Sequence, residues 1–339
     1  MTRMGLLGVI PLVVVAMLGG QPASAMTPPV SQPSVDALWW ATGQLQACQK
    51  PVQDGQLGDC FSGQSRGFNV GPFTDGVNVY AGSGSGGGGQ VCPLSGLAQS
   101  GCQEFGNGWV FSDTKSLAAY GGLAFIGQMQ FNDNNDHPIY SCPVSALTNI
   151  STTSSTMPAG CSQLDNPGKE ANPVVMLAVP DHLYVGLQPE GTVNDGGIVW
   201  SCSPTVANSC TNLDNSGSNY PLSFAYGAGY LWVGLSNGIL WRCDPDTANA
   251  CTNWAKFDYS ITSLALDGMG SIYASLSWRP GATGGFNRSG SVYECSVATA
   301  TSGACPEVIS GVFGKTQISA GSSIAAGPGG VFAMTACGY

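Results

Sequence analysis

Carboxylate, amide and imidazole side chains gather between Phe131 and His137, in the order Phe-Asn-Asp-Asn-Asn-Asp-His. Asp133, Asn135, Asp136 and His137 offer ligands to a cation, and their oxygens suit a hard ion such as Ca²⁺. Asn and Asp are also common in solvated turns, and an EF-hand would add a central glycine and a glutamate at its twelfth position. We favour the turn, expect no metal or cofactor, and keep these four residues as candidate ligand contacts.

Two further candidate contacts are Trp278 and Arg279, in the segment Ser-Trp-Arg-Pro. The segment is an insertion that interrupts the pattern of the residues around it. Inserted surface loops carry binding residues more often than regular elements do. We therefore predict that any ligand contact is made by such non-repeating segments.

Carboxylates that recur along the chain raise the question of catalysis. Asp165, Asp214 and Asp258 each follow a cysteine by a few residues, and pairs of carboxylates can hydrolyse glycosidic bonds. Recurrence at similar places instead favours a turn or capping role. A serine triad is disfavoured because the chain has two histidines and lacks a Gly-x-Ser-x-Gly elbow. No reaction is identified, and a non-enzymatic role is favoured.

Aromatic side chains recur at fixed places as well. Tyr140, Trp200, Trp241 and Tyr293 each stand two residues before a cysteine. Rows of aromatic rings can bind sugars, but each unit of a repeat protein must fill the same space against its neighbour. We therefore interpret these rings, and those in the preceding apolar runs, as core: Trp39, Trp40, Tyr184, Trp232 and Tyr273.

The thirteen cysteines form six close pairs and one single residue, Cys337. Zinc sites use shorter cysteine spacings and histidine partners, so we interpret the pairs as disulfides of an exported protein. The predicted pairs are Cys48/Cys60, Cys92/Cys102, Cys142/Cys161, Cys202/Cys210, Cys243/Cys251 and Cys295/Cys305.

Each cysteine pair belongs to a longer repeat. In one copy, runs such as Leu-Trp-Val-Gly-Leu and Ile-Leu-Trp-Arg-Cys flank Asn237-Gly238, a strong hairpin signal. Four short β-strands per unit, repeating at roughly 40 to 60 residues, are typical of propeller blades. In each unit, the first cysteine of the pair should lie at the end of the third strand and the second cysteine at the start of the fourth strand.

In this repeat form the chain resembles secreted β-propellers. The resemblance implies an all-β fold of four-stranded blades, and the order of the cysteines predicts one disulfide in each blade. Six blades are the first choice and seven the alternative. In the six-blade arrangement a C-terminal strand completes the first blade and closes the ring. Residues 26–339 are expected to form this single domain.

The first 25 residues have the plan of a secretory signal peptide, with Arg3, an apolar run and Ala-Ser-Ala at the cleavage site. We therefore expect a secreted protein without a membrane span. The net charge of −10 disfavours nucleic-acid binding. Asn149 and Asn287 stand in glycosylation sequons.

These features predict an extracellular binding module whose loops meet a glycan or a protein surface. The alternatives are a polysaccharide hydrolase or lyase with carboxylates at the centre of the ring, and a structural wall or coat component. The oligomeric state, the ligand and the partner of Cys337 stay open.

Overall fold

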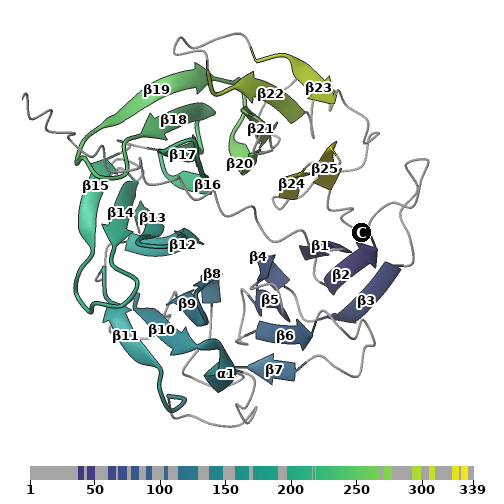
Figure 1. Cartoon of the computed structure of the whole chain (residues 1–339), viewed down its shortest axis with the longest axis vertical. Coiled ribbons are helices and arrows are strands. Elements are labelled where there is room, and N and C mark those ends of the chain that lie inside the picture. The colour runs from purple at the N-terminus through teal and green to yellow at the C-terminus, as the bar shows by residue number, and fades with distance from the viewer. Residues whose placement is uncertain are drawn as a thin grey trace, which may run out of the picture.

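The computed structural model shows antiparallel sheets set around a ring (Figure 1). In the part of the chain that it describes there are five four-stranded sheets, one three-stranded sheet and one two-stranded sheet. The described residues are 37–41, 44–49, 60–65, 68–74, 78–83, 89–93, 103–105, 114–128, 137–147, 157–167, 171–189, 197–215, 217, 219–266, 270–276, 292–298, 305–309, 323–327 and 330–334.

Every four-stranded sheet is a meander of consecutive strands. The first strands, nearest the ring centre in Figure 1, are β4 (Phe68–Thr74), β8 (Thr114–Tyr120), β12 (Ala171–Ala178), β16 (Pro221–Gly227) and β20 (Ile261–Leu266). The second strands are β5 (Asn78–Ser83), β9 (Leu123–Gln128), β13 (Leu183–Pro189), β17 (Tyr230–Leu235) and β21 (Ser271–Leu276). The third strands are β6 (Gly89–Pro93), β10 (Ile139–Pro143), β14 (Ile198–Cys202), β18 (Ile239–Cys243) and β22 (Val292–Ser296). The outermost strands are β7 (Gln103–Phe105), β11 (Ser162–Asp165), β15 (Thr211–Asn215), β19 (Cys251–Lys256) and β23 (Glu307–Ile309).

The two ends of the chain form smaller sheets. At the N-terminal end, the three-stranded sheet consists of β1 (Ala37–Ala41), β2 (Gln44–Gln49) and β3 (Cys60–Ser65). At the C-terminal end, β24 (Ser323–Gly327) pairs with β25 (Gly330–Met334). Among the described strands, β1 pairs with β2 alone, which differs from the expected closure of the first blade by a C-terminal strand. The blade number stays a prediction.

Four of the predicted cysteine pairs are disulfides in the structure, and they occupy the same place in four consecutive blades. The bonds are Cys142–Cys161, Cys202–Cys210, Cys243–Cys251 and Cys295–Cys305. Each joins the end of the third strand to the start of the fourth, as predicted. The ladder also pairs Cys48 with Cys60 across β2 and β3. Cys102 and Cys337 lie outside the described residues, so the Cys92–Cys102 bond and the state of Cys337 stay predictions.

The Cys142–Cys161 connection contains a short helix, α1 (Val144–Leu147), which the glycine-rich composition did not predict. The helix buries Leu147 against the cluster that contains Leu117 and Ile126. Among the described residues, no helix is both long and apolar enough to span a bilayer.

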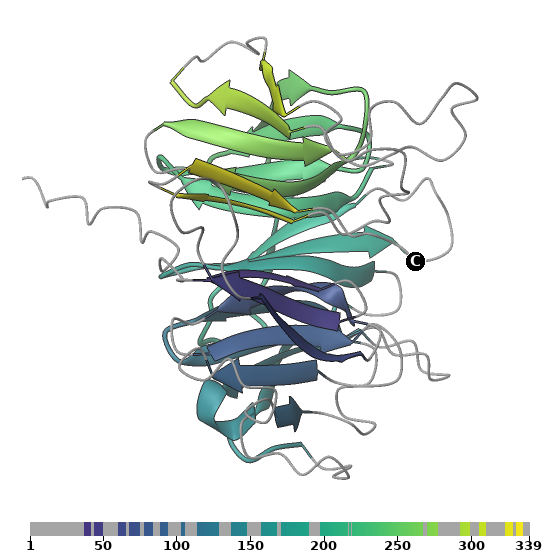
Figure 2. The same cartoon turned by 90° about the vertical axis from the view of Figure 1, so that its right-hand side faces the viewer.

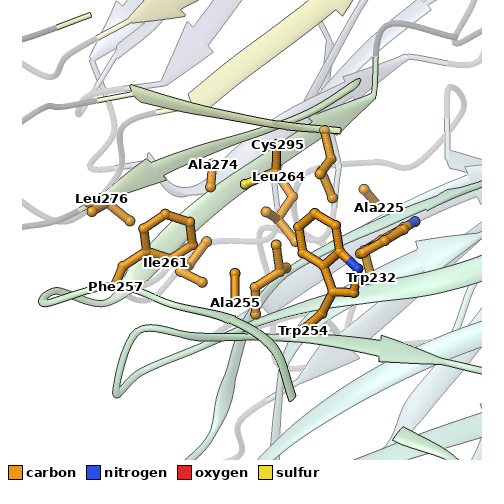
Figure 3. Packing of buried hydrophobic residues seen from close by; sticks show 12 residues of the cluster. Ala225, Trp232, Trp254, Ala255, Phe257, Ile261, Leu264, Ala274, Leu276 and Cys295 are labelled. Atoms are coloured by element: carbon orange, nitrogen blue, oxygen red, sulfur yellow. The ribbon is translucent and has the colours of Figure 1, made fainter. Parts of the chain in front are cut away.

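The hydrophobic core lies between neighbouring blades. Figure 3 shows the cluster between the β16–β19 and β20–β23 blades, where Trp232 of β17 meets Trp254 of β19 edge-on at 5.1 Å between ring centroids. Ile261 and Leu264 of β20 close the cluster from the next blade. Burial of these rings removes large apolar areas from water, which is the main favourable term in folding.

A glycine in the second strand lets the next blade approach. A Cβ on Gly234 would lie 2.4 Å from Ser223 Oγ and 2.6 Å from Ile261 Cγ2. Gly127 and Gly186 meet the next blade in the same way. Ser223 Oγ then donates a hydrogen bond to the carbonyl oxygen of Ile261, at 3.0 Å. The glycine of the second strand and the serine of the first strand therefore allow neighbouring blades to pack closely.

The Asn237-Gly238 hairpin is confirmed, but its two residues do not both have the positive φ that a two-residue Asn-Gly turn uses. Gly238 has φ of +83° and its N–H donates to the carbonyl oxygen of Leu235. Asn237 does not share the positive φ. Its side-chain oxygen instead accepts from the N–H of Ile239 at 3.0 Å. The turn therefore needs glycine at one position only.

Candidate interaction face

The meander sends two kinds of connection to one end of the ring. The turns between first and second strands and the disulfide turns between third and fourth strands share this end, because successive strands alternate in direction. We call it the disulfide face. The connections between second and third strands and those between blades share the opposite face. In Figure 2 the strands run across the ring from one face to the other.

Most of the candidate contacts predicted from the sequence cannot be placed. Asp133, Asn135, Asp136, Trp278 and Arg279 lie outside the described residues. His137 is described and lies two residues before β10, where its side chain is fully buried. A ligand-binding role for these residues therefore stays a prediction, and the structure does not bring His137 to the surface.

Two of the recurring aspartates join neighbouring blades. Asp214 Oδ2 accepts from the backbone N–H of Cys251 at 3.0 Å, and Asp165 Oδ2 accepts from that of Cys210 at the same distance. Each carboxylate thus binds the next blade's disulfide turn, which extends the expected capping role across the blade boundary. Asp258 does not belong to this series. Ala255 holds the equivalent place, four residues after its cysteine, and Asp258 is exposed.

Three of the seven recurring aromatics whose side chains the structure describes are buried, as expected, and the other four, Tyr140, Trp200, Tyr273 and Tyr293, are partly buried. Tyr140, Trp200 and Tyr293 pack against the core clusters. Tyr184 and Trp232 are fully buried, and Trp241 is nearly so. The indole N–H of Trp241 donates to Asn253 Oδ1 at 2.7 Å. The side chains of Trp39 and Trp40 lie outside the description.

One group of side chains on the disulfide face does not follow the repeat. His182 lies directly before β13, and its ring stacks on Tyr184 with centroids 5.4 Å apart. Tyr184 in turn lies 6.1 Å from the ring of Tyr226, in the next blade. His182 Nε2 is 3.6 Å from Asp246 Oδ1, in the next blade's disulfide turn. With two neighbouring carboxylates these residues form the acidic aromatic cluster: Asp181, His182, Tyr184, Tyr226, Asp244 and Asp246.

The carboxylates set the electrostatics of the cluster. Burial raises the pKa of Tyr184, and Tyr226, Asp246 and Asp244 raise it further. The pKa of Tyr226 is raised by burial and then by Asp246 and Asp181. Negative potential at both hydroxyl groups disfavours a phenolate and favours positive charge. Asp246 itself is 79% exposed, so its charge faces solvent.

The same places in the adjacent blades are neutral. By ladder register, His182 corresponds to Leu123 in the preceding blade and Tyr230 in the following one. Asp246 corresponds to Thr205. Tyr184 corresponds to Phe125 and Trp232, Tyr226 to Ala178 and Leu266, and Asp181 to Gly122, Gly229 and Gly270. The acidic aromatic cluster is therefore a departure from the repeat at one blade boundary.

At the preceding boundary the corresponding space is hollow. A cavity of about 300 Å³ lies there, between Leu123 and Ser141 on one side and Pro204 and Thr205 on the other. His182 and Asp246 meet across the next boundary, whereas their equivalents here, Leu123 and Thr205, line the cavity instead. The two boundaries are built from equivalent strands but expose different side chains to solvent.

The disulfide face also exposes apolar area. Among the described residues, the exposed large hydrophobic side chains are Val206, at 55%, and Tyr230, at 36%. Both lie on this face, in the β14–β15 turn and at the start of β17. The guanidinium of Arg242 covers the Tyr230 ring, with Cζ 4.7 Å from its centroid.

The acidic aromatic cluster was not predicted from the sequence, because Tyr184 was interpreted as core and His182 was only one of two histidines weighed against a serine triad. The signal was present in the alignment of the repeats. A histidine beside an aspartate replaces small or apolar residues there, and the disulfide turn carries Asp246 in place of Thr205.

Known proteins match this chain by fold alone. No family model matches the sequence, and no curated protein matches it. A chain in a crystal structure of a mitotic checkpoint complex has a TM-score of 0.55 at 12% identity, covering 91% of this chain and 84% of that one. A chain in a crystal structure of a nidogen/laminin complex has a TM-score of 0.52 at 12% identity, covering 80% and 91%. The WD40 β-propeller domain of Doa1 has a TM-score of 0.48 at 10% identity, covering 79% and 77%.

The chain is an all-β β-propeller of four-stranded blades with disulfides inside the blades. The four disulfides indicate that it folds in an oxidising compartment.

Proposed function

We propose that this propeller is an extracellular protein-interaction module that binds its partner through the disulfide face. The observation that carries the proposal is the acidic aromatic cluster, which departs from the repeat at that face while the blade scaffold around it stays regular. The exposed side chains of Val206 and Tyr230 support the same face. The chains similar in fold come from crystal structures of protein complexes, which agrees with a role in binding.

The enzyme alternative finds less support. The described inner strands β4, β8, β12, β16, β20 and β24 contain neither Asp nor Glu. A glycosidase needs two carboxyl groups within about 10 Å of each other. Residues on these strands therefore do not supply the central acid and base that a polysaccharide hydrolase would use.

Site-specific photocrosslinking tests the proposal. The secreted chain would carry benzoylphenylalanine at Val206 or Tyr230 on the disulfide face, and at Asn237 or Asp258 on the opposite face as matched controls. After exposure to extracellular material from cultures of the source, we expect a protein adduct from the first two positions only. A glycan array run in parallel tests the sugar alternative.

Adducts that form only from Asn237 or Asp258 would assign binding to the opposite face, where the loops predicted from the sequence connect the strands. Binding to the glycan array without any protein adduct would replace the protein partner with a glycan. Release of sugars from a polysaccharide, with no adduct from either face, would overturn the proposal in favour of the enzyme.

A further inference from the structure

We infer that the acidic aromatic cluster binds the cationic side chain of an arginine- or lysine-bearing segment of the protein partner. This inference rests on the proposed function and names the chemistry of the partner. It concerns the boundary between the β12–β15 and β16–β19 blades, where the cluster is drawn from both sides.

The aromatic part of the cluster provides a surface for a cation. The rings of His182 and Tyr184 are nearly parallel, at 9°, and Tyr226 continues the stack at 23° to Tyr184. Tyr226 is half-buried, so its ring is partly accessible at the blade boundary. An ammonium or guanidinium group is attracted to the face of a tyrosine ring. The face already contains one such contact, between Arg242 and Tyr230.

The carboxylates surround that surface with negative charge. Asp181 and Asp246 both act on the Tyr226 hydroxyl, and Asp244 and Asp246 act on that of Tyr184. All three carboxylates are exposed, on turns from two different blades. They would repel a phosphate or a sulfate. A guanidinium can bind a carboxylate through two parallel N–H donors, which makes arginine the better match.

A buried hydroxyl is a second, independent sign of a ligand. Tyr184 is fully buried, and among the described residues its hydroxyl group has no hydrogen-bond partner. Buried polar groups are nearly always hydrogen-bonded. In the preceding blade Phe125 holds this place without a hydroxyl, so the scaffold does not require one. A guanidinium beside Tyr226 would reach this oxygen once the contact between Tyr184 and Tyr226, with ring centroids 6.1 Å apart, opens.

A metal ion fits the cluster less well. In the described part of the chain, no group of three histidine, cysteine, aspartate or glutamate side chains lies close enough to hold one. The exposed side chains of Val206 and Tyr230, elsewhere on the disulfide face, also suit a polypeptide better than a small ion. A basic segment with one apolar residue would match both features of the disulfide face.

The adjacent blades supply replacements that the scaffold already accepts. Asp246→Thr copies Thr205, Asp181→Gly copies Gly122, and Tyr184→Phe copies Phe125. Asp258→Asn on the opposite face removes the same charge from an exposed site. This control separates local recognition from the general attraction between a basic peptide and an acidic protein.

The test measures binding of a fluorescent peptide with alternating arginine and glycine residues to the full secreted chain, by anisotropy at physiological salt. Asp246→Thr and Asp181→Gly should each weaken binding about fivefold, the value of one exposed ion pair. Tyr184→Phe should weaken it as well, and Asp258→Asn should change it less than twofold. A lysine version of the peptide should bind more weakly than the arginine version.

Equal losses in Asp258→Asn and Asp246→Thr would overturn the inference, because binding would then follow net charge. Failure of the unmodified chain to bind the peptide would overturn it too. Photocrosslinking from Val206 and Tyr230 tests separately whether the disulfide face binds a protein partner at all. Adducts that persist in the Asp181→Gly/Asp246→Thr double variant would show that the face binds a partner without this cationic contact.

Discussion

At the scale of single residues, Asp214 shows how a repeated side chain stabilises a boundary between blades. Its two carboxylate oxygens accept from the backbone N–H groups of Asn215, at 2.7 Å, and Cys251, at 3.0 Å. The N–H of Asn249 donates to Leu213 in return, at 2.6 Å. One short segment thereby satisfies backbone donors of its own strand and of the next disulfide turn.

Asp214→Ala should lower the free energy of unfolding by about 1–2 kcal/mol, because the N–H of Cys251 loses a charged acceptor. Urea unfolding with the disulfides intact measures this change. Asp258→Ala is the control and should stay within about 0.5 kcal/mol, since Asp258 is exposed. Equal effects from both substitutions would show that the hydrogen bond between blades adds nothing to stability.

The Tyr184 hydroxyl gives the stability of the molecule a dependence on alkaline pH. Its pKa in the folded state is raised above the ordinary value of 10.0. The unfolded chain then releases this proton at a lower pH than the folded chain, so the folded state binds more protons. Stability attributable to this group is complete below pH 10.0 and falls as the pH rises above that value.

Tyr184→Phe should therefore reduce the loss of stability above about pH 10, where one such group contributes up to about 1.4 kcal/mol per pH unit. Tyr226 retains a smaller effect in the same direction, because its pKa is also raised. Near neutral pH the variant should be as stable as the unmodified chain, since it removes a buried hydroxyl without a described partner. Melting curves across the alkaline range test both statements, and identical pH profiles would contradict them.

At the scale of the elements, the second strand's glycine sets how closely one blade approaches the next. Gly234→Ala should cost about 1–3 kcal/mol by overpacking, because its Cβ meets Ser223 and Ile261 at the distances given above. Ser275 occupies the same place in the β20–β23 blade, so Ser275→Gly serves as the matched control. The control should cost less than about 1 kcal/mol. A neutral Gly234→Ala would mean that the blades can separate without loss.

Features that arise within one unit were predicted from the sequence, and features that join two units were not. The Cys243/Cys251 spacing and the Asn237-Gly238 turn act within a few residues, so the disulfides and the hairpin could be predicted. The Trp232–Trp254 contact needs the fold of a whole blade, and the His182–Asp246 contact needs two blades in register. These residues carry no local sequence pattern beyond a departure from the repeat.

The grouping of Asp258 with Asp165 and Asp214 was wrong for a related reason. The grouping relied on each aspartate being near a cysteine. In the strand ladder, however, equivalence depends on the exact number of residues after the cysteine. At the equivalent position Ala255 packs in the core. This blade therefore lacks the hydrogen bond that Asp165 and Asp214 accept from the next blade at the two preceding boundaries. Ladder register, rather than residue type, decides which side chains are equivalent in a repeat protein.

At the scale of the whole molecule, closure of the ring determines whether the blades act as one unit. The strands β24 and β25 lie between the β20–β23 blade and the N-terminal sheet in Figure 1, and β24 packs along β20. Without them the β20–β23 blade would expose the side that other blades bury against a neighbour. An uncovered blade loses apolar contacts and leaves strand edges open to association.

A chain that ends before Ser323 should therefore unfold at a lower temperature than the full chain, and it should associate on heating. A chain that ends after Met334 is the control, because it keeps both strands while removing Cys337. Thermal unfolding and light scattering, with the disulfides intact, compare the two. We expect the control to match the full chain, because the ring depends on the strands and not on the terminal thiol. If both truncated chains unfold at the same temperature as the full chain, then β24 and β25 do not close the ring. If the control alone loses stability, then Cys337 takes part in a disulfide that the six predicted pairs do not include.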